Sequence, residues 1–246
     1  MAEIAAVAQA SRLSARSVVL SVLLGAHPAS ATAAELIRLT ADFDITDTAL
    51  RVALTRMVSA GDLVRSADGY RLADRLLERQ RRQDAALAPC LRDWDGRWLT
   101  LIVTRTGADA RSRAELRRLL ADNRFGELRE GVWLRPDNID ADLDAEIAPW
   151  VRVLSAHDAD PVGLAAALWD LPAWRDTGGE LLAAMAQAAD VPARFAVAAA
   201  IVRHLRTDPV LPADLLPDGW PGGGLRAAYR DFAGDFAAGA RIAFMP

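Results

Sequence analysis

Residues 45–74, ITDTALRVALTRMVSAGDLVRSADGYRLAD, combine one helical pattern with two short strand patterns. Apolar residues recur at helical spacing over residues 47–60, which predicts an amphipathic helix with one face in a core. This apolar stripe consists of Leu50, Ala53, Leu54, Met57 and Val58. Thr46 is a suitable N-cap for the helix, and Gly61 is a suitable residue to end it.

A hairpin and two more helices are expected around this helix. The runs 63–66 and 70–72, separated by a turn that ends in Asp-Gly, predict two antiparallel strands. Upstream, residues 14–25 begin at a potential N-cap, Ser14, and residues 32–42 begin with a capping box. The capping-box residues are Thr32 and Glu35. Three helices followed by a hairpin are the plan of a winged helix, a DNA-binding fold with its last helix in the major groove.

The N-terminal segment also has some features of a secretory leader. Arg12 and Arg16 precede an apolar run, and small residues follow it. The run is short and is interrupted by Ser21, and its apolar residues have helical spacing. We therefore interpret the segment as the first helix of the winged helix. No stretch of the chain approaches the length of a transmembrane helix.

The polar face of the helix over 47–60 is suited to DNA. Thr48, Arg51, Thr55 and Ser59 are spaced three, four and four residues apart, so they share one side. Arginine can donate two hydrogen bonds to guanine, and hydroxyl groups can bond bases or phosphates. Arg56 lies to one side, where it could reach the backbone. Every surface helix has a polar face, however, so a structural role or a protein partner stays open as an alternative.

The remaining patterns predict a multidomain α+β protein. An Arg-rich helix is expected next, then a β-α-β-α-β segment with the crossovers of a ferredoxin-like α/β sandwich, then Ala-rich helices. The predicted domains are a winged helix DNA-binding domain (12–75), a linker helix (76–95), a ferredoxin-like domain (96–158) and a mostly α-helical C-terminal domain (160–246). A proline-rich stretch, 207–224, interrupts the last of these.

Composition describes a globular protein with an uneven charge. The chain has 246 residues, of which 52% are hydrophobic and 25% charged, and its net charge is −4. All 29 basic residues are arginine. Residues 1–88 hold 11 arginines against 10 acidic residues, whereas the remainder holds 18 against 23, so a DNA surface is expected in the first third. The acidic balance predicts weak non-specific DNA binding. The single cysteine, Cys90, excludes an intrachain disulfide and favours the cytoplasm.

Several segments together resemble PaaX-type transcriptional regulators, the repressors of bacterial phenylacetic acid degradation. SARSVVLSVLLG (14–25) and the opening stretch resemble their winged helix, which is similar to that of GntR-type regulators. WDGRWLTLIV (94–103) and RSRAELRRLLADNRFGELREGVWLRP (111–136) resemble their ferredoxin-like middle domain, which is similar in fold to a small CRISPR-associated nuclease. VRHLRTDPVLPADLLPDGWPG (202–222) resembles their C-terminal signature. The resemblance covers nearly the whole chain.

The resemblance implies a homodimeric repressor of a catabolic operon that leaves its double-stranded operator DNA on binding an aryl- or acyl-CoA, such as phenylacetyl-CoA. It implies DNA contacts by Thr46 and Arg51, and backbone contacts by Arg16 and Ser17. Two features depart from the family. Asp47 stands where relatives often have a basic or small neutral residue, and the wing lacks their usual basic tip, so a modest wing contribution is expected.

Other chemistry is sparse. The three histidines have no metal-ligand spacing, no cofactor motif is present, and the acidic residue expected of a nuclease is absent at the end of the strand 98–104. We therefore expect no enzyme, although a nuclease or hydrolase remains a rival interpretation. Arg203, His204 and Arg206 could meet the phosphates of an acyl-CoA effector, or simply complement a helix C-terminus. The seven tryptophans fill cores, or some of them line an aromatic effector pocket.

Overall fold

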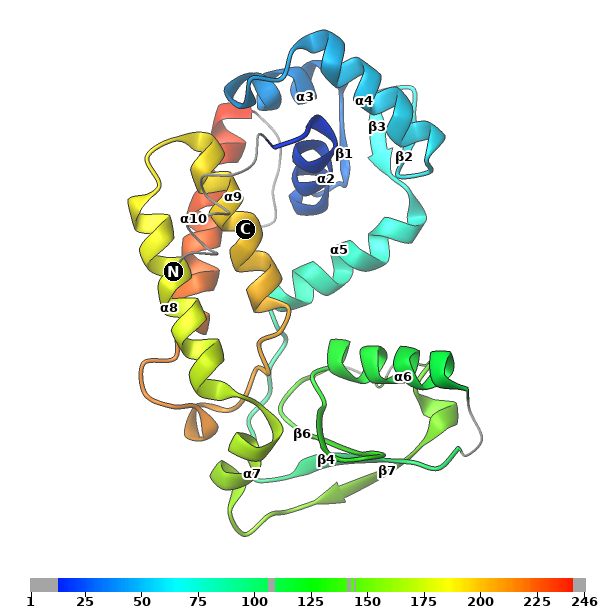
Figure 1. The fold of residues 1–246 in the computed structure, drawn as a ribbon, viewed down its shortest axis with the longest axis vertical. Coiled ribbons are helices and arrows are strands. Elements are labelled where there is room, and N and C mark those ends of the chain that lie inside the picture. The colour runs from blue at the N-terminus through cyan, green and yellow to red at the C-terminus, as the bar shows by residue number, and fades with distance from the viewer. Residues whose placement is uncertain (1–12, 106–108, 141–142, 144, 241–246) are drawn as a thin grey trace. The chain divides into compact units, whose positions relative to one another are not determined.

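The computed structural model describes residues 13–105, 109–140, 143 and 145–240. It is an α+β structure with two antiparallel sheets, as predicted (Figure 1). The chain divides into two compact units. Unit 1 comprises Met1–Leu87, Gly178–Leu205 and Pro221–Pro246, and unit 2 comprises Ala88–Thr177 and Arg206–Trp220. Two parts of the predicted domains lie outside the described residues: residue 12, which begins the predicted DNA-binding domain, and residues 241–246, which end the predicted C-terminal domain.

The first helices of unit 1 begin at the predicted caps. Helix α2 (Ala15–Gly25) is capped by Ser14, and α3 (Ala33–Thr40) begins with a complete capping box between Thr32 and Glu35. A 3-10 turn, η1 (Ala41–Phe43), leads to α4 (Asp47–Ser59), whose N-cap is Thr46. The predictions for these three helices are confirmed, because caps and apolar spacing are local signals that survive in the folded chain.

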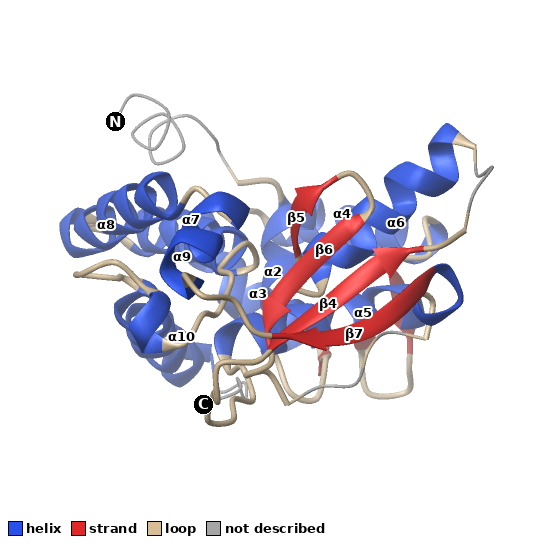
Figure 2. Cartoon of the chain, turned by 90° about the horizontal axis from the view of Figure 1, so that it is seen from below, coloured by secondary structure: helices blue, strands red, loops and turns tan. Residues whose placement is uncertain are grey.

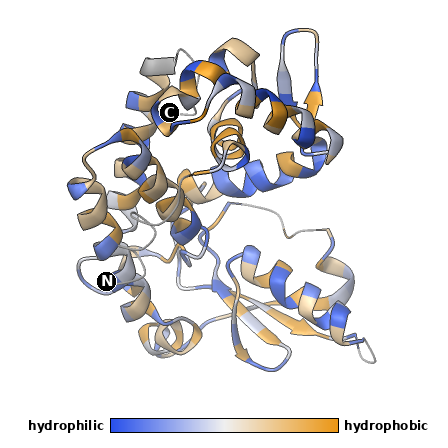
Figure 3. Cartoon of the chain, turned by 45° about the horizontal axis from the view of Figure 1, so that its top comes forward, coloured by the Kyte–Doolittle hydropathy of each residue, from blue (hydrophilic) through white to orange (hydrophobic). Residues whose placement is uncertain are grey.

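Helix α2 forms the centre of unit 1. Val18, Val19 and Leu23 have no exposed surface, and Figure 3 shows the helix largely in the apolar colour. Helix α5 (Asp74–Leu87) packs against α2. The buried Gln80 side chain donates hydrogen bonds to carbonyl groups at the end of α2, where the last carbonyls have no partner within the helix. The linker helix predicted over 76–95 is shorter in the structure and ends at Leu87, because Pro89 disfavours helical backbone before it.

The predicted hairpin is confirmed, but the sheet has one more strand. Strands β2 (Leu63–Arg65) and β3 (Tyr70–Leu72) pair in antiparallel register. A two-residue strand, β1 (Ser30–Ala31), pairs with β3 on its other side, so the order is β1-β3-β2. The wing turn passes so close to β1 that a Cβ on Gly69 would lie 2.4 Å from the Ala31 carbonyl oxygen. Gly69 also has a φ of 150°, so glycine is required here on two grounds.

The C-terminal helices complete unit 1. Helices α9 (Val191–Leu205) and α10 (Gly222–Ala240) pack on each other, and both contact the N-terminal part of the unit. Phe43 of η1 makes edge-to-face contacts with Phe195 of α9 and Phe236 of α10, with ring centroids 5.1 and 6.4 Å apart. The segment that precedes α4 is therefore packed against residues about 150 to 190 positions later in the chain.

Unit 2 contains a four-stranded antiparallel sheet, shown in Figure 2. Its strands are β4 (Trp98–Val103), β5 (Gly126–Arg129), β6 (Val132–Pro136) and β7 (Val151–Ala156), in the order β5-β6-β4-β7. Helix α6 (Ala110–Asp122) buries Leu116, Leu119 and Leu120 against a core that includes Leu101. Trp98, at the start of β4, belongs to a separate core. This core also contains residues of α7 (Pro161–Leu168) and of the turn η3 (Ala213–Leu215), and the first residue of α8 (Leu171–Gln187).

Two predicted elements of unit 2 differ in detail. The strand-like stretch 125–136 is a hairpin, since Gly131 turns the chain with a φ of 78° between β5 and β6. In the stretch 140–150, where the sequence predicts the second crossover helix of the β-α-β-α-β segment, residues 141, 142 and 144 lie outside the described residues. Residues 145–147 form a turn, and the 3-10 helix η2 (Ala148–Trp150) follows. Pro149 supplies no backbone donor, which disfavours a longer α-helix there.

In the part of the chain that the structure describes, the apolar stretches of the helices are too short or too polar for any of them to cross a bilayer.

Two adjacent glycines of α8 provide a matched test of helix packing in unit 1. A methyl group on Gly178 would lie 2.6 Å from Cγ of Pro221 and 3.2 Å from Cδ1 of Leu225, whereas one on Gly179 would meet nothing within 4 Å. We expect Gly178→Ala to lower the free energy of unfolding by about 1–3 kcal/mol through overpacking. Gly179→Ala should raise it by up to about 1 kcal/mol through helix propensity. Urea denaturation measures both, and equal effects would contradict this packing.

A buried tyrosine predicts an alkaline loss of stability. The pKa of Tyr229 is raised to about 12, mainly by burial and also by nearby Asp84, while a hydrogen bond with Gln83 opposes the rise. An unfolded tyrosine ionises at about pH 10. The neutral, buried side chain of Tyr229 therefore contributes its full stabilisation below that pH, and this stabilisation is lost as the pH rises toward 12. We expect a fall of roughly 2–3 kcal/mol in unfolding free energy over this window. The chain has no lysine to titrate in the same range.

Urea denaturation between pH 9 and 11.5 measures this fall. Tyr229→Phe should remove most of the pH dependence, and Tyr70→Phe, the control at the other tyrosine of the chain, should retain it. Equal slopes for the two variants would show that Tyr229 does not carry the effect.

Candidate nucleic-acid interface

Helix α4 separates a buried face from a broad exposed face. Leu50, Leu54 and Met57 are at most 1% exposed and hold the helix to the core. On the opposite side Thr48, Arg51 and Thr55 are all exposed. The 3.6-residue repeat of the helix puts these three side chains in one strip, as the sequence predicted. The strip offers hydroxyl groups and one guanidinium group, all of which can form hydrogen bonds to bases or phosphates.

The start of α4 is held in place by its own capping and by the turn before it. Asp44 adopts a left-handed conformation with a φ of 55°, which turns the chain from η1 into α4. The Thr46 side chain accepts a hydrogen bond of 3.2 Å from the Ala49 backbone amide. This bond uses the oxygen of the Thr46 hydroxyl as acceptor, so its proton can still be donated to a ligand. Asp47 is exposed in the first turn, where the positive end of the helix dipole stabilises a carboxylate.

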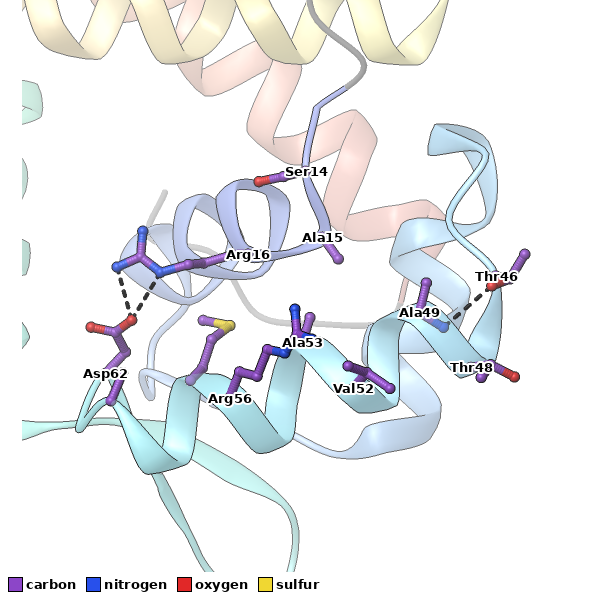
Figure 4. Close-up of a pocket in the computed structure, with 12 residues that line it drawn as sticks. Ser14, Ala15, Arg16, Thr46, Thr48, Ala49, Val52, Ala53, Arg56 and Asp62 are labelled. Carbon is purple, nitrogen blue, oxygen red and sulfur yellow. Dashed lines mark hydrogen bonds and ion pairs between the residues drawn. The ribbon is translucent and has the colours of Figure 1, made fainter.

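A hollow separates α4 from the N-terminal end of α2 (Figure 4). Four of the predicted DNA-contact residues line it together: Arg16, Thr46, Thr48 and Arg56. The rest of its lining is mostly small or apolar, and consists of Ser14, Ala15, Ala49, Val52, Ala53, Met57, Ala60 and Asp62. Residues from two separate helices therefore converge on one surface. Arg51 and Thr55 lie outside this lining, farther around α4.

Arg16 has a structural role that the sequence did not predict. Its Nε and Nη2 atoms lie 3.0 and 2.8 Å from Oδ2 of Asp62, whose side chain is 2% exposed. The other carboxylate oxygen of Asp62 pairs with Arg75 of α5, which also donates to the Gly61 carbonyl at 2.9 Å. A buried carboxylate is costly unless it is paired and hydrogen-bonded. Through these ion pairs the two arginines connect α2 and α5 to the turn after α4. The Arg16 side chain is nevertheless 59% exposed.

The other predicted contact residues differ in how much of their hydrogen-bonding capacity is already used. Within the described part of the chain, neither Arg51 nor Arg56 has an ion-pair partner, so both guanidinium groups are available to an anion. The Thr55 hydroxyl donates to the Arg51 carbonyl at 3.0 Å, which leaves its lone pairs as acceptors. Ser17 is exposed, and its hydroxyl lies 2.9 Å from that of Ser14.

The wing carries little positive charge at its tip. Its turn is closed by a hydrogen bond of 2.9 Å from the Ser66 amide to the Gly69 carbonyl, and Asp68 is its charged residue. Of the two wing arginines, Arg71 is paired with Asp74 at 3.1 Å, and Arg65 is exposed. The arrangement agrees with the expectation of a modest wing contribution, since phosphate contacts depend on available cations.

The three residues considered for an effector belong to different units. Arg203 and His204 lie in the last turn of α9, in unit 1. Arg206 belongs to unit 2, where its Nη2 atom lies 4.0 Å from Oδ1 of Asp122. Its carbonyl accepts a 2.6 Å hydrogen bond from Arg124. His204 packs beside Gly178, since a Cβ there would lie 3.4 Å from its Nε2 atom.

Other chemistry is limited to aromatic packing. No group of three or more metal-ligating side chains occurs among the residues that the structure describes. Cys90 is exposed. Trp98 is fully buried, and Trp174 stacks on Trp220 with ring centroids 4.3 Å apart. The burial of Trp98 agrees with the interpretation that tryptophans fill cores, whereas Trp174 and Trp220 are only partly buried. The aromatic effector pocket stays a prediction.

Sequence reasoning missed two features of this surface. Val52 is 45% exposed in the lining of the hollow, although helical periodicity alone already separates it from the apolar stripe. The sequence indicates no role for Asp62, which is 1% exposed in the structure. Its burial depends on Arg16, 46 residues earlier, and on Arg75, 13 residues later. No local pattern signals a partner at such distances.

Comparison with known protein families matches three consecutive parts of the chain. Residues 14–76 match a family described as PaaX-like protein, residues 91–157 match the PaaX protein central Cas2-like domain, and residues 172–245 match the PaaX-like protein C-terminal domain. Among solved structures, an uncharacterized protein from Mycobacterium tuberculosis is similar, with 66% identity, a TM-score of 0.83, and coverage of 93% of this chain and 98% of that one. Comparison with curated proteins gives no match.

The ion pairs of Asp62 predict a specific loss of stability. Asp62→Asn keeps the shape of the side chain but replaces its charge, and directs an amide donor toward one of the two arginines. We expect the free energy of unfolding to fall by about 1–3 kcal/mol, a value reduced by the half-exposed positions of both arginines. Urea denaturation measures the change. Asp68→Asn in the exposed wing turn is the control, and should have an effect below about 0.5 kcal/mol. Equal effects would rule out the fastening role of Asp62.

Proposed function

The chain belongs to the PaaX-like family, and from this membership we propose that it is a transcriptional regulator that binds operator DNA through an N-terminal winged helix. The observation that carries the proposal is the exposed polar strip of α4 beside the hollow at the start of α2. The order α2-α3-α4 followed by the β2-β3 hairpin, with β1 closing the sheet, supports the winged-helix description. In this fold α4 is the helix that enters the major groove.

The residues of α4 would divide the task of recognition. Arg51 is the candidate for a base edge, because its guanidinium group has no ion-pair partner among the described residues and can donate two hydrogen bonds to a guanine. Thr48 and the acceptor lone pairs of Thr55 lie on the same strip and would bond neighbouring base edges. These contacts would specify the sequence, since only base edges differ between operators.

The surrounding residues would bind the phosphate backbone. Arg56 and Arg16 line the hollow from α4 and α2, and the proton of the Thr46 hydroxyl is free to be donated to a phosphate oxygen. Ser17 is exposed beside Arg16 at the N-terminal end of α2, where backbone amides and the helix dipole also favour an anion. Such contacts fix the position of the protein on DNA, and they make its affinity depend on salt.

Regulation would act on a dimer. In a two-fold homodimer, two copies of α4 would bind half-sites one helical turn, or a multiple of it, apart. An aryl- or acyl-CoA thioester, phenylacetyl-CoA being the first to try, would release the operator by stabilising a dimer with a different spacing. The ligand can shift this equilibrium only by its differential affinity for the two geometries. Arg203, His204 and Arg206 remain candidates for contacts with the phosphates of the thioester.

The middle of the chain would serve as a scaffold rather than as an enzyme. Its strand order, β5-β6-β4-β7, supports a ferredoxin-like sandwich, although the second crossover contains a 3-10 turn in place of a helix. The strand β4 ends in Val103, followed by Thr104 and Arg105, which supply no carboxylate for a nuclease. A role in joining two protomers is the function that suits this unit.

The proposal is tested by fluorescence anisotropy on labelled DNA from upstream of the gene at physiological salt. We expect specific binding by the wild type, and a loss of about 5- to 150-fold in affinity in Arg51→Ala, the usual range for one bidentate base contact. Arg129→Ala, an exposed arginine on β5 of unit 2, is the control and should bind as the wild type does. Arg56→Ala should weaken binding to all sequences and reduce the salt slope by about one.

Release of the operator by one member of a panel of aryl- and acyl-CoA thioesters would identify the effector. Binding by the wild type no tighter than to random DNA would contradict the proposal. It would favour a module in which α4 binds another protein, and such binding should change little with salt.

A further inference from the structure

Val52 is the unusual residue on the exposed face of α4. It is 45% exposed, although the core beneath the helix is already filled by Leu50, Leu54 and Met57. A β-branched residue is also a weaker helix former than alanine. Helix packing therefore gives no reason for valine at this position, and contact with a ligand would.

The neighbours of Val52 suggest which ligand it contacts. Thr48 and Arg56 lie one turn before and one turn after it on the same side of α4, and both line the same hollow. Ala49 and Ala53 are small and line the same hollow, and Figure 4 shows Val52 near them on α4. A partner that docks on the row formed by Thr48, Val52 and Arg56 must therefore present one apolar group between polar or anionic groups.

Duplex DNA presents such a pattern in its major groove. The 5-methyl group of thymine is the apolar group that a base pair offers there, whereas the other base edges offer hydrogen-bond donors and acceptors. A valine opposite a donor or acceptor would leave it without a partner, which is unfavourable. Valine also has one strongly preferred rotamer in a helix, so its two methyl groups form a fixed surface.

We infer that Val52 contacts the 5-methyl group of a thymine in each half-site and sets the preference for thymine at that position. This inference rests on the proposed function, because it requires α4 to lie in the major groove. It adds a residue whose discrimination comes from apolar contact, beside the hydrogen-bonding residues Arg51, Thr48 and Thr55.

The experiment begins with the full chain and a pool of random duplexes. Binding duplexes are enriched, and one consensus duplex is then resynthesised with each thymine replaced in turn by deoxyuridine. This replacement removes only the methyl group and keeps the base pair. Dissociation constants are measured for the wild type, Val52→Ala and Val64→Ala. Val64 is the matched control, since it is a 36% exposed valine of the wing strand β2.

At one thymine of each half-site we expect deoxyuridine to weaken binding by the wild type about three- to tenfold, which corresponds to the loss of one buried methyl group. Val52→Ala should lose this sensitivity and respond to the replacement by less than twofold. Val64→Ala should keep it. Val52→Thr, a second variant with one methyl group fewer, should respond more weakly than the wild type. Unchanged melting temperatures would show that the variants fold.

Two results have different meanings. If the wild type enriches a consensus but Val52→Ala responds to every deoxyuridine as the wild type does, the inference about Val52 is overturned and the proposed function stands. If the wild type enriches no sequence, the proposed function itself fails.

Discussion

The buried carboxylate of Asp62 is the constraint on which the arrangement of α2, α4 and α5 around the proposed DNA-binding surface depends. A carboxylate with only 2% of its side chain exposed must be paired, and its two oxygens are taken by arginines from α2 and α5. Its backbone amide also bonds the Met57 carbonyl at the end of α4, at 2.9 Å. Asp62 thus links three helices: α4, which is proposed to contact bases, α2, which is proposed to contact the DNA backbone, and α5.

The same constraint explains why Arg16 is a different kind of residue from Arg51 and Arg56. Arg16 is held by Asp62 with more than half of its side chain exposed, so its guanidinium group is positioned before any ligand arrives. An oriented cation loses less conformational entropy on binding than a mobile one. Arg51 and Arg56 have no such partner in the described chain, and their contacts would be formed only on the DNA.

The C-terminal helices α9 and α10 belong to the same unit as the proposed DNA-binding surface. Phe43, just before α4, is 7% exposed and packs against Phe195 of α9 and Phe236 of α10. Arg194 of α9 and Asp235 of α10 form an ion pair of 3.0 Å beside this cluster. Changes in the packing of α9 on α10 therefore bear directly on the segment that sets the start of α4. Under the proposed function, this closely packed set of aromatic rings would be a physical route for an effector to act on DNA binding.

The sequence by itself determined the elements whose signals are local. The caps at Ser14, Thr32 and Thr46, the apolar stripe of α4 and its polar strip could be predicted because hydrogen bonds and helical periodicity act over a few residues. Only the tertiary structure decided that Asp62 is buried by two arginines, that β1 joins the wing, and that Phe43 packs on α9 and α10. Each of these pairings joins residues that are distant in the chain. It forms because a buried charge, a backbone amide or an aromatic ring requires a partner, and no local sequence pattern predicts which residue that partner is. Val52 lies between the two cases. Periodicity put it outside the core, but only the packing of α2 on α4 places it in the lining of the same hollow as Arg16 and Ser14.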